Sequence, residues 1–330
     1  MLRGLRCGVG FIFCGLLMVL MAVDPSNAQE TKIPRIGLIL LGGPGPSDAA
    51  IRKGFADLGY VEGQSIILEL RFAHGDLKRA REFAAELVTL KVDVIAGAGL
   101  LGVGTAREFT KTIPIVFSAA PDPAALGYVA SLERPGANLT GITSFDPKQA
   151  AEQLAILQQV VPKLSRISVI SDAGIPRVNG RNPLEHTIEE AAQSANIHIH
   201  WVKLEWPKPD IATAVQSAFT DGSQAIIVLE ATLALFHLKA IAEQAAKHRL
   251  PTVFPGGWPS DGLIKYGTSI LYATPRIPYV VDKILKGANP AELPIEVVTK
   301  RELVINLKTA VEIGVTIPSE LLKRADRVVQ

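Results

Sequence analysis

Three glycines in this chain have the spacing of a nucleotide-binding loop. Gly97, Gly99 and Gly102 spell G-x-G-x-x-G. They follow a strand-like run, Val92 to Ala96, and lead into a predicted helix. In dinucleotide-binding folds such glycines let the backbone approach a pyrophosphate, and an acidic residue about 20 positions further on binds the ribose. Asp122 comes late for that role, and the motif follows the third predicted strand instead of the first, so the pattern argues against NAD.

The same loop could bind an anion that is not a nucleotide. Parallel sheets bind ligands at the carboxyl ends of their strands, where helix N-termini present unpaired N–H groups. Because the glycines keep bulky side chains away, backbone donors of Ala98, Gly99 and Leu100 could reach a carboxylate. The alternative is a tight turn that contacts no ligand.

The other candidate ligand-binding residues follow predicted strands in the same way. Asp122 could pair with a ligand ammonium or cap the helix that starts near Pro123. Glu230 directly follows a buried strand, and a carboxylate there needs a partner. Trp258 could stack on a flat ligand or pack between domains, and Thr232 could cap the next helix. The full set is Gly42, Gly43, Ala98, Gly99, Leu100, Ser118, Asp122, Ser171, Asp172, Glu230, Thr232, Gly256 and Trp258, with Tyr266 as a further hydroxyl donor.

Metal binding and catalysis have little support in the sequence. His198 and His200 alternate with apolar residues, which places both on the polar face of a strand. An H-x-H pair without a spaced carboxylate or Cys is weak evidence for zinc. Neither G-x-S-x-G nor H-E-x-x-H occurs, and no carboxylate pair stands out for glycoside chemistry. We therefore expect no catalytic residue, no metal and no cofactor.

The elements that must position these residues alternate between strand and helix, which predicts an α/β protein with two parallel-sheet domains flanked by helices. The apolar run Arg35 to Leu41 is typical of a strand buried on both faces. The first series of predicted strands comprises 35–41, 65–72, 92–96, 113–117 and 138–143. A helix then opens at Asp146 and Pro147. The second series comprises strands 167–171, 197–202, 225–229 and 251–254, with helices at 183–195, 211–219 and 233–248.

The C-terminal part breaks this alternation. Residues 262–269 are predicted to be extended, 279–286 to be helical, 293–298 and 302–307 to form late strands, and 319–328 to form a closing helix. We expect these pieces to return to the first domain and cross over again.

The N-terminus has the three-part layout of a secretory signal peptide. Arg3 and Arg6 precede an apolar run, Val9 to Val23, and Ser26-Asn27-Ala28 offers small residues before a cleavage point. We expect residues 1–28 to be removed after Ala28, which makes the mature chain periplasmic. The alternatives are a lipoprotein and an uncleaved anchor, although the run is shorter than the about 20 apolar residues that span a bilayer.

Charge and cysteine content narrow the class of protein further. Both cysteines, Cys7 and Cys14, lie in the predicted signal peptide, so the mature chain would have no disulfide. The net charge of +2 falls to +1 when Arg3, Arg6 and Asp24 are removed, which gives no indication of a nucleic-acid partner. No second long apolar run occurs, so we expect a mature chain that is not embedded in a membrane, and a monomer.

Several short patterns together resemble a known family. They are Thr112-Ile-Pro-Ile-Val-Phe117, Asp122-Pro123, Arg134-Pro-Gly136, Asn138-Leu-Thr-Gly-Ile142, Gly262-Leu-Ile-Lys-Tyr-Gly267, Tyr279 to Gly287, Leu293-Pro294 and Glu302 to Ala310. Over Pro34 to Val328 the chain resembles the substrate-binding proteins of ABC importers, in the group that includes tryptophan- and tyrosine-type binders.

The resemblance implies a periplasmic-binding-protein fold of type I, in which two α/β lobes are joined by a three-strand hinge. Lobe I would comprise residues 31–144 and about 268–296, and lobe II residues 145–267 and about 297–330. It also implies a small-molecule ligand held between the lobes, and a membrane permease with its ATPase as partners.

The sequence departs from the family pattern at two places. Members usually carry a small polar loop with Thr and Pro where this chain has Ala98 to Leu101, and often Tyr-Arg where it has Thr274 to Pro278. The first departure falls on a predicted ligand loop, so it weakens the transfer of amino-acid specificity. The sequence predicts a solute-binding protein, and not an enzyme, that closes on a small organic solute such as an aromatic amino acid or a related carboxylate. An exported hydrolase-like enzyme and the ligand-sensing lobe of a signalling system are the alternatives.

Overall fold

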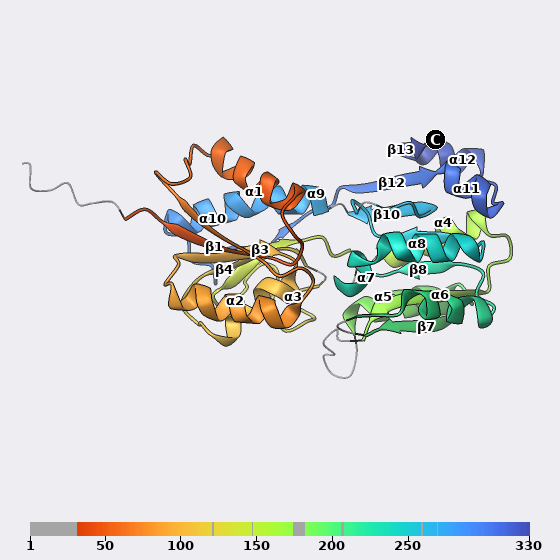
Figure 1. Ribbon diagram of the computed structural model, residues 1–330, viewed down its shortest axis with the longest axis horizontal. Coiled ribbons are helices and arrows are strands. Elements are labelled where there is room, and N and C mark those ends of the chain that lie inside the picture. The colour runs from red at the N-terminus through yellow and green to blue at the C-terminus, as the bar shows by residue number, and fades with distance from the viewer. Residues whose placement is uncertain are drawn as a thin grey trace, which may run out of the picture. The chain divides into compact units, whose positions relative to one another are not determined.

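The computed structural model describes residues 32–120, 122–146, 148–173, 182–205, 208–230, 232–258, 260–268 and 270–330. The predicted signal peptide and its cleavage point, together with both cysteines, lie outside the described residues. Apart from Lys32, every described residue belongs to one compact unit, Ile33–Gln330. Two sheets run through this unit (Figure 1).

The first sheet has six strands in the order β11-β5-β4-β3-β1-β2. All of its pairings are parallel. The strands are β1 (Arg35–Leu40), β2 (Ile67–Phe72), β3 (Val94–Ala98), β4 (Ile115–Ala120), β5 (Leu139–Thr143) and β11 (Glu296–Val297). The order agrees with the predicted first series plus one late strand that returns from the C-terminal part.

Helices cover both faces of the first sheet. In β1, Ile36 and Leu38 pack against α1 (Pro46–Asp57) and α10 (Ile277–Leu285). Ile39 points to the other face, where α2 (Leu77–Thr89) packs. Burial on both faces explains why β1 reads as a continuous apolar run. In Figure 1, α1 and α10 lie above this sheet and α2 lies below it.

The second sheet has seven strands in the order β13-β12-β10-β9-β8-β6-β7. Its pairings are parallel except for β10 against β12, which is antiparallel. The strands are β6 (Arg166–Asp172), β7 (His198–Leu204), β8 (Ile226–Val228), β9 (Thr252–Phe254), β10 (Ile264–Thr268), β12 (Arg301–Asn306) and β13 (Arg327–Val329).

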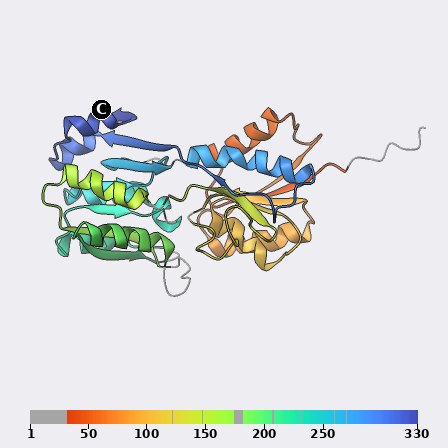
Figure 2. The ribbon, with the colours of Figure 1, turned by 180° about the vertical axis from the view of Figure 1, so that it is seen from behind.

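This sheet is also covered on both faces. One face packs against α4 (Gln149–Val160), α5 (Pro183–Ser194), α11 (Leu307–Ile313) and α12 (Ser319–Arg324). The other packs against α6 (Ile211–Thr220), α7 (Thr232–Phe236) and α8 (Leu238–Lys247). Figure 1 shows α8 in front of the sheet, and Figure 2, seen from behind, shows α4 and α5 on the opposite side. The predicted architecture of two parallel-sheet domains is confirmed.

The chain passes from one sheet to the other three times. The first crossing follows β5 and leads to α4, the second follows β10 and leads to α9 (Ile270–Ala273), and the third joins β11 to β12. A short 3-10 helix, η2 (Thr274–Arg276), continues α9 into α10. Each crossing therefore begins at the carboxyl end of a strand, which is β5, β10 or β11.

Several element predictions are wrong in their bounds. The helix predicted over 233–248 is divided into α7 and α8, and the strand predicted over 293–298 is reduced to β11 (Glu296–Val297). The helix expected to open at Asp146 and Pro147 begins at Gln149. The Oδ1 atom of Asp146 accepts a hydrogen bond from the backbone N–H of Lys148 at 2.9 Å, which is a turn ahead of the helix. The closing helix expected over 319–328 ends at Arg324, and Arg327–Val329 forms β13 beside β12.

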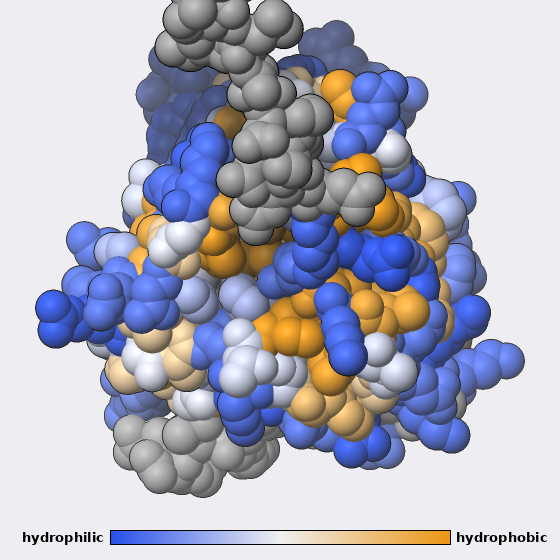
Figure 3. All heavy atoms as spheres, turned by 90° about the vertical axis from the view of Figure 1, so that its left-hand side faces the viewer, coloured by the Kyte–Doolittle hydropathy of each residue, from blue (hydrophilic) through white to orange (hydrophobic). Residues whose placement is uncertain are grey.

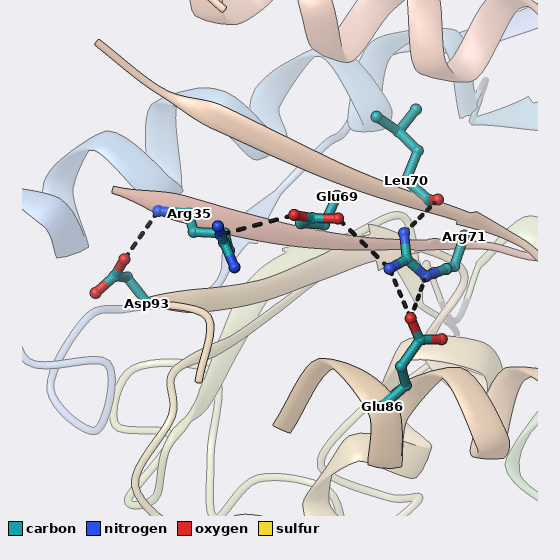
Figure 4. Close-up of polar contacts among 6 residues, drawn as sticks. All are labelled: Arg35, Glu69, Leu70, Arg71, Glu86 and Asp93. Carbon is teal, nitrogen blue, oxygen red and sulfur yellow. Dashed lines mark hydrogen bonds and ion pairs between the residues drawn. The ribbon is translucent and has the colours of Figure 1, made fainter. Parts of the chain in front are cut away.

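A chain of charged residues fixes the first two strands and α2 (Figure 4). The backbone N–H of Arg35 donates to Asp93 at 2.8 Å, and its guanidinium lies 3.6 Å from Glu69. Arg71, on β2, contacts Glu69 at 3.4 Å and Glu86 of α2 at 2.7 Å. The hydrogen bond from Arg71 lowers the pKa of Glu86. These contacts tie the amino-terminal strands to the helix below them.

Several exposed apolar side chains lie at the edge of the first sheet where its strands begin, opposite the carboxyl ends of the strands. Ile33, Val61 and Leu90 are each more than a third exposed and lie in the segments that lead into β1, β2 and β3. Figure 3, which views the left-hand side of Figure 1, shows hydrophobic residues near the middle of that face between hydrophilic ones. The edge that carries the predicted ligand-binding residues is therefore a different one.

Candidate functional site

The glycine loop after β3 is explained by close packing inside the first sheet. A Cβ atom on Gly97 would lie 2.1 Å from the carbonyl oxygen of Ile39, and one on Gly102 would lie 2.8 Å from Cγ of Leu41. Gly99 has a φ of 88°, which favours glycine. The spacing G-x-G-x-x-G thus follows from contacts with β1 and its following loop, which accounts for it without a nucleotide.

The helix predicted after this loop is a single turn. α3 covers only Leu100–Val103 and continues as the 3-10 helix η1 (Gly104–Glu108). Leu100 is 1% exposed and belongs to the core beneath the sheet, whereas Ala98 and Gly99 keep part of their surface accessible. A one-turn helix offers little macrodipole for an anion, so the loop contributes at most backbone donors.

The remaining candidates at the first sheet lie at its carboxyl edge. Gly42 and Gly43 follow β1 and are at least partly exposed. Ser118 of β4 is fully buried, with its Oγ 3.5 Å from the Oγ1 of Thr274. Asp122 accepts a hydrogen bond from the backbone N–H of Ala125 at 2.9 Å. This contact lies in a run of turns over 123–127, and the structure forms no helix there for Asp122 to cap.

At the second sheet, Ser171 and Asp172 end β6 and are almost fully buried. The Ser171 hydroxyl donates to Glu185 at 3.1 Å, and Lys203 also donates to that carboxylate. Asp172 accepts from the backbone N–H of Ala234 at 3.0 Å, which holds the first turn of α7. Ser171 and Asp172 thus form contacts within the second sheet and its helices.

A pocket lies at the carboxyl end of β8, beside the first crossing. Apolar side chains of Phe145, Leu184 and Leu229 form part of its wall. Its polar lining consists of Ser144, Asp146, Gln149, Gln153, Thr187 and Glu230. Of the predicted ligand-binding residues, the structure brings Glu230 to this pocket.

Glu230 has unusual surroundings for a carboxyl group. No hydrogen bond or ion pair joins it to another residue of the described chain. Burial of the carboxyl raises its pKa to about 8, because a low-dielectric environment disfavours the charged form. The sequence argument that this carboxylate needs a partner therefore points to a partner outside the described chain.

Ser144 is a second polar group that lines the pocket without a partner. It is 2% exposed, and its Oγ makes no hydrogen bond within the described residues. Buried hydroxyls are normally hydrogen-bonded, and one that is not lacks about 1–3 kcal/mol of stabilisation. A ligand or a water molecule that enters the pocket can satisfy both Ser144 and Glu230.

The sequence analysis missed Ser144, Asp146, Gln149, Gln153 and Thr187. Ser144 and Asp146 follow β5 just as Glu230 follows β8, so the same rule of strand endings would have found them. Gln149 and Gln153 lie one turn apart on α4, and only the placement of that helix brings them to the pocket.

Three further candidates follow β8 or β9. A Cβ atom on Gly256 would lie 2.2 Å from the carbonyl oxygen of Gly267, so glycine lets β10 approach closely. Trp258 packs against the core of α6 and α8, and its Nε1 is buried without a partner among the described residues. Thr232 is the first residue of α7. None of the three is part of the pocket lining that the structure describes.

Tyr266 belongs to a polar network beside the pocket. Its hydroxyl donates to Glu152, and its carbonyl oxygen accepts from Nε2 of the pocket residue Gln153 at 3.1 Å. Burial and the bond to Glu152 raise the pKa of Tyr266. Arg301, at the third crossing, pairs with Glu152 at 2.7 Å and with Asp146 of the first crossing. The network thus connects the pocket to two of the crossings.

The sequence predicted neither a metal site nor a membrane-embedded mature chain. Within the described residues, no three His, Cys, Asp or Glu side chains gather as metal ligands would. His200 instead lies 3.6 Å from Asp221. Among the same residues, no helix has the length and apolarity that a membrane span requires.

Comparisons with known proteins agree with this arrangement. The family model described as "ABC transporter substrate binding protein" matches residues 45–329. A tyrosine-binding protein of Clostridioides difficile (strain R20291) is 23% identical over 270 residues, which are 80% of this chain and 76% of that protein.

Two solved structures have the same fold. One, from Streptococcus pneumonia, is an ABC domain in complex with L-Trp, with a TM-score of 0.79 and 22% identity over 90% of this chain and 99% of that one. The other is a conserved domain protein of Vibrio cholerae, with a TM-score of 0.79 and 24% identity over 90% of this chain and all of that one (100%).

Proposed function

Since this chain belongs to the family of ABC transporter substrate binding proteins, we propose that it is the extracytoplasmic receptor of an importer, which captures a small organic solute. The pocket at the end of β8 is the observation that carries this proposal, because it is lined by the partly buried carboxyl of Glu230 and the buried hydroxyl of Ser144, which lack partners in the described chain. The family consists of binding proteins, so the alternative of an exported hydrolase-like enzyme is set aside.

The ligand would lie between two lobes that close on it. We assign residues 31–144 and about 268–296 to lobe I, and 145–267 and about 297–330 to lobe II, with the three crossings as the hinge. A ligand that contacts both lobes favours the closed arrangement by its higher affinity for that state. The edge of lobe I would contribute Gly42, Gly43, Ala98, Gly99 and Ser118.

The solute class that fits best is an amino acid with an apolar or aromatic side chain. Glu230 would pair with its ammonium group, Ser144 would hydrogen-bond to it, and Phe145, Leu184 and Leu229 would contact its side chain. Two relatives support this choice, since one is a tyrosine-binding protein and the other binds L-Trp. Trp258 remains a candidate for stacking on an aromatic ring.

Export and delivery complete the proposal. Residues 1–28 would serve as a signal peptide that is cleaved after Ala28, and the mature protein would act in the periplasm as a monomer. The closed form would then be recognised by an ABC permease with its ATPase.

The proposal is tested by identifying what the purified protein carries. The protein is denatured, and the released small molecules are identified by mass spectrometry. The recovered compound and a panel of amino acids, aromatic acids and sugars are then added back in thermal-shift measurements, because a ligand of the folded state raises the midpoint of unfolding. We expect an amino acid to be recovered and to raise the midpoint. Recovery of no solute, together with no shift across the panel, would reject the receptor function.

A further inference from the structure

The pocket at the end of β8 contains acidic but no basic side chains among its described lining residues. Asp146 and Glu230 are the two chargeable groups of that lining. Asp146 forms an ion pair with Arg301, and Arg301 forms a second ion pair with Glu152. Glu230 therefore lies in a wall that supplies it with neither a cation nor a hydrogen-bond donor from the described chain.

The charged groups on the surrounding elements are engaged elsewhere. On β6, Asp172 accepts from the start of α7, and on α5, Glu185 is bound by Lys203 from β7. Burial lowers the pKa of His237, which follows α7, so its surroundings disfavour the charged imidazolium. The pocket-facing residues of α4 are Gln149, Ala150 and Gln153, which carry no charge.

A carboxyl group in such a place holds its proton. Burying an ionised carboxylate without a counter-charge is far more costly than burying the neutral acid, so the group neutralises instead. The raised pKa of Glu230, about 8, agrees with this argument from the surroundings. At neutral pH the pocket is thus lined by a protonated acid and by the unpartnered hydroxyl of Ser144.

We propose that the ligand's ammonium group displaces the proton of Glu230, so that capture of the solute releases one proton to water. This inference rests on the proposed function, because it needs a ligand with a cationic nitrogen. The O–H bond of the Glu230 carboxyl breaks, its electron pair stays on the carboxylate, and the ammonium supplies the counter-charge. The proton leaves through the open side of the pocket before the lobes close.

The coupling makes affinity depend on pH in a defined direction. Below about pH 8 each bound solute must expel the proton, so the association constant rises by up to about tenfold per pH unit and then levels off. A ligand that instead accepts a hydrogen bond from protonated Glu230 gives the reverse pattern. Its affinity is constant below about pH 8 and falls above it.

The test is calorimetric titration of the whole purified protein with L-tryptophan and L-tyrosine. At about pH 6.5 the titrations are run in phosphate and in imidazole, because a released proton is taken up by the buffer and adds the buffer's heat of protonation, which differs between the two, to the observed heat. We expect close to one proton released per bound amino acid. 3-Indolepropionate, which lacks the ammonium group, is the matched ligand and should release none.

Two variants test whether the released proton comes from the Glu230 carboxyl or from another group of the protein. Glu230→Gln keeps the size and hydrogen-bonding capacity of the protonated acid, and it should bind with no proton release and with an affinity that no longer varies with pH. Glu243→Gln, an exposed carboxylate on α8, should behave as the unchanged protein. Carbonyl-13C NMR of the unchanged protein gives an independent readout, since addition of L-tryptophan should shift the Glu230 titration to lower pH.

The outcomes distinguish this inference from the function on which it rests. An amino acid that binds without releasing a proton, or that releases the same number in Glu230→Gln, overturns the inference and leaves the receptor function standing. The same holds if the solute that the protein carries has no cationic nitrogen. If no solute binds at all, both are rejected.

Discussion

Single residues in this protein show why a motif must be read with its neighbours. The spacing of Gly97, Gly99 and Gly102 resembles a nucleotide loop, yet two of these glycines are required by the approach of Ile39 and Leu41. Glu230 is the opposite case. Its position after a buried strand was enough to predict that a carboxylate there needs a partner, and the structure surrounds it with a pocket.

At the residue scale, Glu230 should also govern how stability varies with pH. Its pKa in the folded protein, about 8, lies above the ordinary value of 4.5, so the folded state binds the proton more tightly than the unfolded state. The free energy of unfolding should therefore fall as pH rises from about 5 to about 8. Glu230→Gln should remove this fall and be the more stable protein at about pH 9, as urea unfolding at several pH values would measure.

Glu243→Gln serves as the control for that series, because it removes an exposed carboxylate from the same set of helices. It should retain the pH dependence of the unchanged protein. An equally steep fall in Glu230→Gln would contradict the assignment of a protonated carboxyl at this position.

At the scale of elements, most strands and helices could be predicted because their apolar periodicity is set by burial on known faces. β1 and β3 are continuous apolar runs, and α2 has one apolar stripe. The element bounds that were predicted wrongly are set by contacts with distant parts of the fold. Arg327–Val329 becomes β13 because β12 offers it an open edge, and no local pattern in the sequence reports that edge.

The site was less predictable than the elements for a related physical reason. Strand endings can be located from the sequence, which found Glu230 and could have found Ser144 and Asp146. Gln149, Gln153 and Thr187 enter the pocket from α4 and α5. Their positions depend on how these helices pack on the sheet, and the sequence pattern does not contain that geometry.

Arg301 connects α4 to two of the crossings. It lies at the third crossing itself and contacts both the first crossing and α4. It pairs with Asp146 and Glu152, and its side chain is 27% exposed. Arg301→Gln would leave Asp146 as an uncompensated charge at the pocket. We expect the free energy of unfolding to fall by about 2 kcal/mol, between the values for buried and exposed ion pairs. Urea unfolding monitored by circular dichroism would measure the difference.

Arg52→Gln is the matched control, since Arg52 pairs with Glu62 on the surface and both side chains are more than 40% exposed. That loss should stay below about 1 kcal/mol. Equal losses in the two variants would mean that Arg301 contributes no more than a surface ion pair.

At the scale of the whole molecule, the account depends on two sheets whose carboxyl edges and crossings serve one ligand. The family, the fold and the pocket at β8 agree on a binding protein. The assignment of the two lobes, the solute between them and the movement by which a bound solute holds them together are proposals. A permease could then distinguish the loaded protein from the empty one by its shape.

Small-angle X-ray scattering with and without the recovered solute tests this movement most directly. At saturating solute we predict a smaller radius of gyration than for the empty protein, and the change should vanish when the solute is removed by dialysis. A solute that binds, as shown by calorimetry on the same sample, while the radius of gyration stays constant would contradict closure of the lobes.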